Sequence, residues 1–223
     1  MKRIDIVDLV GTTHLNSSVK AMGWVRTKRQ SKNVAFIALN DGSTINNLQV
    51  VAEVEKIGEE VLSQINTGAS ISVEGKLVES AGSGQASELQ AGIIEVLGVA
   101  DPDKYPLQPK RHSLEFLREK AHLRFRTATF SAITRVRHAM IFGIHKFFND
   151  RGFYNIHTPI ITGSDAEGAG EMFRVSVLDA KNPPLTDDGE VDYKQDFFGK
   201  ETNLTVSGQL EAELAALAMT KVY

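Results

Sequence analysis

The segment whose residue types are best suited to binding a small ligand is residues 203–213, near the C-terminal end. It reads Asn-Leu-Thr-Val-Ser-Gly-Gln-Leu-Glu-Ala-Glu, which is typical of a short buried strand, a tight Ser-Gly turn and the start of a helix. Ser207 and Gln209 would place a hydroxyl and an amide at the rim of a sheet, where helix N-terminal N–H groups also point. Such a turn could hold a small zwitterion. A Ser-Gly pair before a helix is also a common helix cap, so the turn alone leaves both interpretations open.

A second group of residues has the chemistry of nucleic-acid binding. On an outward sheet face, Phe36 could stack on a base and Gln49 could read a base edge through hydrogen bonds. Strand alternation does not say which face is outward, and an inward Phe36 would be core instead. Arg26, Lys28 and Arg29 lie nearby in the sequence. They could bind phosphates or be ordinary solvated side chains.

Residues 162–173 form a glycine-rich acidic segment that contains Gly163, Gly168 and Gly170. A carboxylate on such a flexible loop, here Glu167, can close on a substrate ammonium and exclude water. A solvated acidic loop would have the same composition, and the role of Glu171 stays open.

The elements that must position these groups begin with a β-rich region. Alternation and turn signals predict strands at 19–26, 34–41, 48–52, 69–79 and 89–97. Apolar residues at helical spacing from Val54 to Ile65 predict one helix between the third and fourth strands. Residues 1–16 are expected to be a helix or lead-in, and Trp24 is expected in the core. This order is that of an OB-fold barrel, which binds oligonucleotides on its second and third strands.

A proline-rich segment at 102–126 predicts a semi-rigid linker whose Lys and Arg residues could follow an RNA backbone or pair with a partner subunit. Apolar residues every three or four positions then predict a long amphipathic helix over 127–151. The next strand is expected at 153–161. Pro159 lies near its end, as expected for a strand at a sheet edge or bulge. Residues 176–202 are turn-rich and predict a hairpin or excursion.

Length and composition limit the classes of protein to which this chain can belong. A length of 223 residues allows one large or two small domains, and the absence of cysteine excludes disulfides and thiolate metal sites. No apolar run reaches the length of a membrane span, so we expect a soluble, cytoplasmic protein. The six histidines are scattered, and no protein-ligated metal is expected. The net charge of −3 divides into +4, −7, +7 and −7 over residues 1–52, 53–101, 102–151 and 152–223. Two basic blocks suggest two contact surfaces for a polyanion, although scattered solvated lysines would look similar.

Three long segments, in order, resemble the class II asparaginyl-tRNA synthetase family. Residues 204–210 resemble its amino-acid-binding strand, residues 105–127 its linker into the catalytic domain, and residues 165–173 its mobile loop over the substrate. The resemblance implies a multi-domain α+β fold, with an N-terminal OB-fold β-barrel followed by the first part of an antiparallel-sheet catalytic domain. The implied division is an anticodon-binding domain at 1–101, a linker at 102–126 and part of the catalytic domain at 127–223.

The resemblance also implies roles for particular residues. Ser207, Gln209 and Glu167 match the family's amino-acid contacts, with Gln209 at the α-amino end of the substrate. Phe36 and Gln49 match positions that contact the tRNA anticodon. The helix and strand that contain Pro159 resemble the motif that forms the dimer interface, although an ordinary core helix and strand would show the same pattern.

The choice of asparagine over aspartate has a physical argument. In the related aspartyl enzymes a Lys pairs with the substrate carboxylate at the position that is Ala212 here, and Glu211 and Glu213 flank it. An aspartate carboxylate would then be buried without a cation, whereas an amide can donate to a carboxylate. Either Glu could be the acceptor, and we favour Glu213.

The implied reaction is ATP-dependent ligation of asparagine to its tRNA through an aminoacyl-adenylate, with Mg²⁺ accompanying ATP and a homodimer as the implied assembly. The family's two further motifs, which bear ATP-contacting arginines, do not occur in this sequence. We therefore expect no catalytic residue within it and no activity from it alone. The alternatives are a non-catalytic OB-fold nucleic-acid-binding module, an aspartyl-tRNA synthetase, and a tRNA-free relative that amidates aspartate. Such relatives lack the barrel that is expected here.

Overall fold

The computed structural model describes residues 1–82, 84–164 and 172–223. The chain divides into two compact units, Met1–His138 and Ala139–Tyr223. The division falls within one long helix, and each unit is described by itself.

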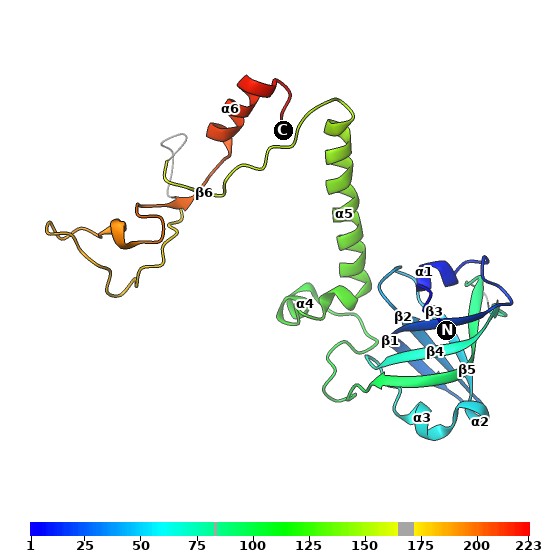
Figure 1. Cartoon of the computed structure of the whole chain (residues 1–223). Helices are drawn as coiled ribbons and strands as arrows, with labels where there is room; N and C mark the ends of the chain where they lie inside the picture. The colour runs from blue at the N-terminus through cyan, green and yellow to red at the C-terminus, as the bar shows by residue number, and fades with distance from the viewer. Residues whose placement is uncertain (83, 165–171) are drawn as a thin grey trace. The chain divides into compact units, whose positions relative to one another are not determined.

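The first unit contains a closed five-stranded barrel (Figure 1). Its strands are β1 (Ser18–Gln30), β2 (Val34–Asn40), β3 (Leu48–Glu53), β4 (Ser70–Glu79) and β5 (Ser87–Gly98). They are ordered β1-β2-β3-β5-β4, and the barrel closes where β3 pairs with β5 in parallel and β4 pairs with β1 antiparallel. This arrangement confirms the OB-fold expected from the strand pattern.

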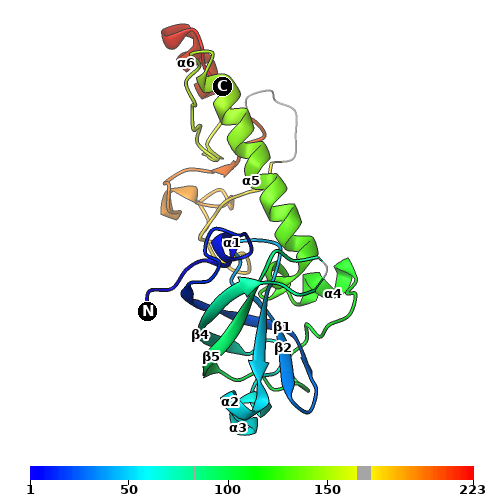
Figure 2. The ribbon, with the colours of Figure 1, turned by 90° about the vertical axis from the view of Figure 1, so that its right-hand side faces the viewer.

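The core is made by strand alternation. Ile37 and Leu39 of β2 are fully buried, as are Leu48 and Val50 of β3. Short helices lie over the two ends of the barrel, α1 (Ile6–Leu9) at one end and α2 (Val54–Ile57) and α3 (Glu59–Ser63) at the other (Figures 1 and 2). Ile6 and Leu9 of α1 and Leu62 of α3 are buried in the same core cluster. Each such side chain contributes about 1.5–3 kcal/mol of hydrophobic free energy.

Two local expectations for this unit were wrong, and a third is made more specific. The helix expected over 54–65 is broken into α2 (Val54–Ile57) and α3 (Glu59–Ser63), because Gly58 between them adopts a φ of +89° that interrupts the helical backbone. The helix or lead-in expected over 1–16 is a lead-in that contains the four-residue helix α1. Trp24 is only partly buried and lies outside the core, because alternation places its neighbour Val25 inside the barrel.

The proline-rich segment after the barrel contains regular structure that its composition did not predict. Helix α4 (Leu114–Glu119) begins at Ser113, whose Oγ accepts a hydrogen bond from Phe116 N at 3.2 Å. The short 3₁₀ helix η1 (Arg124–Arg126) follows. Leu107 and Leu117 are 6% and 2% exposed, so apolar burial holds this segment in a defined conformation.

The expected long helix is present as α5 (Ala128–Asn149). None of its 22 residues is buried in the structure as described. An apolar stripe runs along it, with exposures from 47% to 63%, formed by Ile133, Val136, Met140, Ile141, Ile144 and Phe147.

The strand expected over 153–161 is not formed as predicted. Tyr154 makes an isolated parallel bridge with Val222, and only β6 (Ile161–Thr162) pairs, with β7 (Asn203–Leu204). The backbone N–H groups of Tyr154 and Ile156 bond to the carbonyl oxygens of Lys221 and Tyr223, a pairing too short to extend into a ladder. Pro159 interrupts any continuation because it has no N–H to donate.

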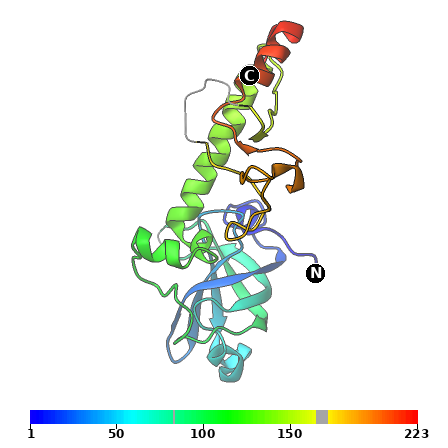
Figure 3. The ribbon, with the colours of Figure 1, turned by 90° about the vertical axis from the view of Figure 1, so that its left-hand side faces the viewer.

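The last part of the second unit follows the expected order with one correction. The excursion over 176–202, drawn in orange in Figure 3, contains a turn closed by the bridge between Leu185 and Val191, followed by η2 (Tyr193–Gln195). Helix α6 (Gln209–Met219) begins after the Ser-Gly turn, as expected. The strand before the turn is not buried, because Leu204 and Val206 are 40% and 60% exposed.

Candidate functional site

Phe36 lies on the outer face of β2 and β3, whereas strand alternation alone had left open whether it faces outward or into the core. Phe36 is 43% exposed between the fully buried Ala35 and Ile37. Its ring therefore faces outward, and the alternative of a core phenylalanine is wrong. Opposite it in the register lies Val51 of β3. Phe36 thus has the exposure that stacking on a nucleic-acid base requires.

Gln49 lies on the same face, diagonally across from Phe36, because it pairs with Ala38 in the register. Its Nε2 donates to Oε2 of Glu88 at 3.4 Å, and Ser80 Oγ donates to the same oxygen at 3.2 Å. Glu88 is only 9% exposed, so the Gln49 amide is oriented by a carboxylate that is itself largely buried. Sequence reasoning missed Glu88, because only the parallel pairing of β3 with β5 brings it opposite Gln49.

The three basic residues expected beside this face separate in the structure. Arg29 is exposed and lies opposite Phe36 in the β1–β2 register. Lys28 instead donates from Nζ to the carbonyl oxygen of Leu62 at 2.6 Å, and burial lowers its pKa. Arg26 donates to the carbonyl oxygen of Arg126. The structure therefore places Arg29 with Phe36 and Gln49, and gives Lys28 and Arg26 partners elsewhere in the first unit.

The Ser-Gly turn in the second unit combines a local hydrogen bond to Ser207 with a hydrogen-bonded pair of polar side chains. Ser207 Oγ accepts from the backbone N of Gln209 at 3.3 Å, and Gln209 Nε2 donates to Oε1 of Glu213 at 2.8 Å. Gly208 packs directly on Thr158, because a Cβ there would lie 2.8 Å from the Thr158 Cβ and Cγ2. A larger residue would push the start of α6 away from the segment that carries Pro159, so this position requires glycine for space.

Of the two glutamates left open, Glu213 is the one that reaches Gln209, one helical turn away. Ser207, Gln209 and Glu213 therefore lie together at the start of α6. Glu167 and Glu171, in the loop expected to close over this turn, lie outside the described residues. Within those residues no group of three or more His, Cys, Asp or Glu side chains could hold a metal ion. In the described part of the chain no helix is both long and apolar enough to cross a bilayer.

Two family models match this chain. One is described as an OB-fold nucleic acid binding domain and matches residues 19–97. The other is described as tRNA synthetases class II (D, K and N) and matches residues 113–223. The first match covers the five-stranded barrel, and the second covers α4, α5 and the whole second unit.

Solved structures show the same fold. The asparaginyl-tRNA synthetase of Pyrococcus horikoshii complexed with asparaginyl-adenylate aligns with a TM-score of 0.79 at 22% identity, covering 100% of this chain and 46% of that one. The enzyme of Entamoeba histolytica aligns with a TM-score of 0.75 at 20% identity, covering 98% and 46%. At these identities the likeness establishes the fold.

Sequence relatives are much more similar. The asparagine–tRNA ligase of Cytophaga hutchinsonii is 61% identical over 225 residues, covering 100% of this chain and 48% of that protein. The asparagine–tRNA ligase of Azobacteroides pseudotrichonymphae is 59% identical over 223 residues, with the same coverage. With two family models in the matching order, this chain belongs to the asparagine–tRNA ligase family of class II synthetases and spans about half the length of the curated relatives it matches.

Proposed function

We propose that this chain contributes the anticodon-binding and amino-acid-binding parts of an enzyme that ligates asparagine to its tRNA, through an aminoacyl-adenylate and at the expense of ATP. The observation that carries the proposal is the outer face of β2 and β3. There Phe36 is exposed, Gln49 is held by Glu88, and Arg29 lies opposite Phe36. An aromatic ring, an oriented amide and a cation together suit a single-stranded anticodon loop.

Each member of this face has a distinct part in recognition. Stacking of one unpaired base on Phe36 is worth about 1–3 kcal/mol and tolerates any base. Sequence is read instead by Gln49, whose amide has both donor and acceptor atoms for a base edge. Arg29 neutralises a backbone phosphate and adds affinity without specificity. In this assignment Arg26 and Lys28, expected to bind anticodon phosphates, do not contact the anticodon, because each has a partner elsewhere in the first unit.

The turn at the start of α6 is the proposed contact for asparagine. Gln209 binds the α-amino end of the substrate, and Ser207 lies beside it at the same turn. Glu213 is the acceptor for an amide N–H, and its negative charge disfavours aspartate at the same place. Glu167, which lies outside the described residues, is proposed to close over the substrate, as the family resemblance implies.

ATP and Mg²⁺ are part of the proposal because class II synthetases use them. Among the described residues no side-chain cluster could hold a metal ion, and Mg²⁺ would accompany ATP as part of the substrate. What these residues supply is positioning, which accounts for much of the catalysis in adenylate-forming chemistry of this kind.

The remaining organisation follows from the same family assignment. We infer an anticodon-binding domain at 1–101, a linker at 102–126 and part of the catalytic domain at 127–223, in a protein of the cytoplasm. The exposed apolar stripe on α5 supports a homodimer whose interface uses this helix and the segment around Pro159, since such a stripe is unfavourable in water.

The test is binding of an asparagine-tRNA anticodon stem-loop to this chain, compared with a stem-loop of changed anticodon. Phe36→Ala should weaken binding of the first about tenfold or more, the loss expected when a stacking platform is removed. Ile93→Ala is the matched control, because Ile93 is 64% exposed on β5 and pairs with Glu74 of β4, away from β2 and β3.

Equal binding of both stem-loops, unaffected by Phe36→Ala, would contradict the proposal. The barrel would then be a general nucleic-acid-binding module. Weakening by Ile93→Ala to the same degree would show that the variants act through stability rather than through stacking.

A further inference from the structure

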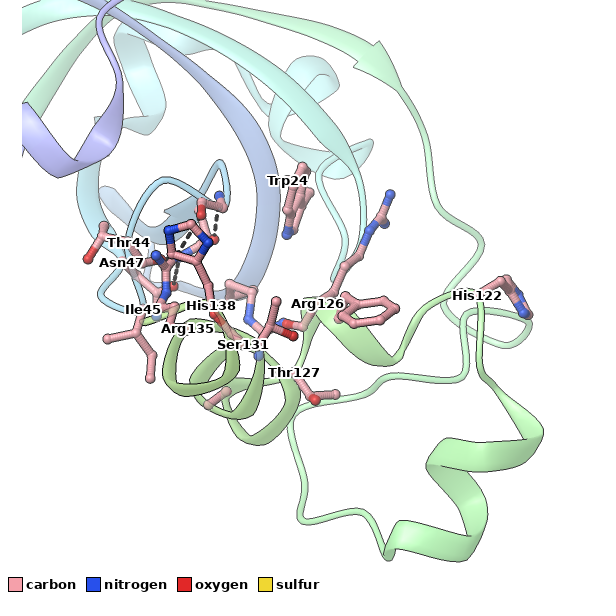
Figure 4. Close-up of a pocket in the computed structure, with 16 residues that line it drawn as sticks. Trp24, Thr44, Ile45, Asn47, His122, Arg126, Thr127, Ser131, Arg135 and His138 are labelled. Carbon is pink, nitrogen blue, oxygen red and sulfur yellow. Dashed lines mark hydrogen bonds between the residues drawn. The ribbon is translucent and has the colours of Figure 1, made fainter. Parts of the chain in front are cut away.

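A cavity of about 870 Å³ in the first unit has no part in the proposed function. It lies between β1, the loop that joins β2 to β3, and the first turns of α5 (Figure 4). Trp24 enters it from β1, Asn47 from the loop, and Arg135 and His138 from α5 (Figure 4). Its volume is within the range of about 300–1,000 Å³ that is usual for small-molecule sites.

The lining is strongly cationic. Arg26, Arg126 and Arg135 all line the cavity, and of the described residues around it none is Asp or Glu. The acidic residue of the neighbouring loop, Asp41, is turned away. Its side chain is 2% exposed, and its carboxylate accepts from Arg3 at 3.2 Å and from the backbone N of Ile6 at 2.9 Å. The guanidinium groups of the cavity therefore have no carboxylate partner among the described residues.

Two of the arginines are held next to each other. Arg26 donates to the carbonyl oxygen of Arg126, and the Arg126 guanidinium lies 4.9 Å from the centre of the Trp24 ring. Burial lowers the pKa of Arg26, and the charge of Arg126 lowers it further against the opposing effect of Tyr105. The two positive charges therefore repel each other, and a bound anion would relieve that repulsion.

Two more donors belong to residues that line the cavity. Arg135 uses Nη2 to bond the carbonyl oxygen of Gly42 at 2.6 Å, and a guanidinium has five N–H donors in all. The indole Nε1 of Trp24 is buried and has no acceptor within the described part of the chain. A buried donor without an acceptor is destabilising, and a bound oxygen ligand would satisfy it.

We propose that this cavity binds a small nucleotide, with its phosphate among Arg26, Arg126 and Arg135 and its base against the apolar lining of Ile45 and Phe125. Guanidinium groups are suited to phosphate because they offer paired, planar donors. A small molecule is favoured over the anticodon loop because Phe36 lies near the start of β2, whereas the cavity contacts Asn40 at its end.

Trp24 makes the proposal directly measurable, because it is the only tryptophan in the sequence. Tryptophan fluorescence of the full 223-residue chain would be titrated with AMP, with inorganic phosphate and with uncharged adenosine. AMP should give a saturable change at lower concentration than either of its parts. Arg126→Gln and Arg135→Gln should each weaken AMP binding about tenfold, the loss expected for one charge-assisted hydrogen bond. Arg126→Lys should recover part of that loss.

The matched control is Arg29→Gln, which removes an exposed guanidinium of the same barrel outside the cavity. It should leave AMP binding unchanged while weakening the anticodon stem-loop. Circular dichroism would confirm that each variant is folded, and the single-bond variant Arg135→Gln remains informative if Arg126→Gln is not. Absence of a saturable change with AMP, an equal response to adenosine, or a response only to RNA would overturn the proposal. Anticodon binding is measured separately, so failure here leaves the proposed function intact.

Discussion

At the scale of single residues, the proposed recognition of the anticodon depends on side chains whose orientation is set by partners distant in sequence. Phe36 faces outward because β2 places Ala35 and Ile37 in the core. Gln49 is oriented by Glu88, which is 39 residues away and reaches it only through the parallel pairing of β3 with β5. A buried carboxylate that fixes an amide raises the selectivity of that amide, because fewer orientations compete for the base.

Glu88 is expected to affect recognition of the anticodon only through the Gln49 amide that it orients. Glu88→Gln should reduce discrimination between the asparagine anticodon and a changed one, because the Gln49 amide loses its charged acceptor. Non-specific, salt-sensitive binding should remain. Competition binding of the two stem-loops measures the ratio. Glu95→Gln removes the same charge from an exposed position of β5 and should leave the ratio unchanged; an equal effect of both variants would contradict a positioning role.

Asp41 gives a prediction for stability. Burial alone would raise its pKa, but hydrogen bonds from Ser43 and Ile6 and the charge of Arg3 outweigh burial and lower it. A lowered pKa in the folded state means that the ionised carboxylate stabilises the fold above its unfolded pKa of about 4, and that this contribution is lost as pH falls through the folded pKa.

Asp41→Asn should therefore lower the free energy of unfolding at pH 7 by about 1–3 kcal/mol, and wild type and variant should converge as the pH falls through the folded-state pKa of Asp41. Urea unfolding at a series of pH values measures this difference. Asp8→Asn, at an exposed position of α1, is the control. A difference that does not shrink on acidification would show that the loss comes from packing rather than from charge.

At the scale of elements, local periodicity identified the strands of the barrel, α5 and α6, but not how much of each is covered. The apolar residues of α5 have the spacing of a core helix, yet all six residues of the stripe are at least 47% exposed. The sequence around Pro159 is apolar enough for a strand. A strand forms, however, only where a neighbouring strand offers backbone partners, and the local sequence cannot show whether one is there.

The apolar stripe predicts self-association through α5. Ile144→Glu should shift the chain from dimer to monomer, because a carboxylate in an apolar interface would be desolvated without a partner. Analytical ultracentrifugation over a range of concentrations measures the change. Asn149→Glu, on the opposite side of the helix by the 3.6-residue period, should leave the mass unchanged. A wild-type chain that stays monomeric at all concentrations would contradict a dimer formed by this chain.

At the scale of the whole chain, the proposed binding of tRNA would depend on the distribution of charge rather than on the net value of −3. Residues 1–52 and 102–151 carry charges of +4 and +7, and the acidic blocks lie elsewhere in the sequence. The second basic block includes Lys110 and Arg111, which are exposed. Exposed cations that contact phosphates release counterions, and binding then falls with salt.

Arg111→Gln should weaken binding of full-length asparagine tRNA and reduce the slope of log affinity against log salt by about one, without changing anticodon discrimination. Filter binding at several salt concentrations measures the slope. Lys181→Gln, in the second unit, is the control of equal charge change. An unchanged slope for Arg111→Gln would indicate that this residue does not contact a tRNA phosphate.

The sequence by itself determined the order of the barrel strands, the positions of α5 and α6, and the Ser-Gly turn before α6, because each depends on spacing within a few residues. It could not determine that Phe36 faces outward, that Lys28 and Arg26 turn away from it, or that Glu88 supports Gln49. Those facts depend on barrel closure, which selects one of two equivalent faces and pairs residues tens of positions apart. The cationic cavity was equally hidden, since Trp24, Arg126 and Arg135 meet only when α5 begins beside β1.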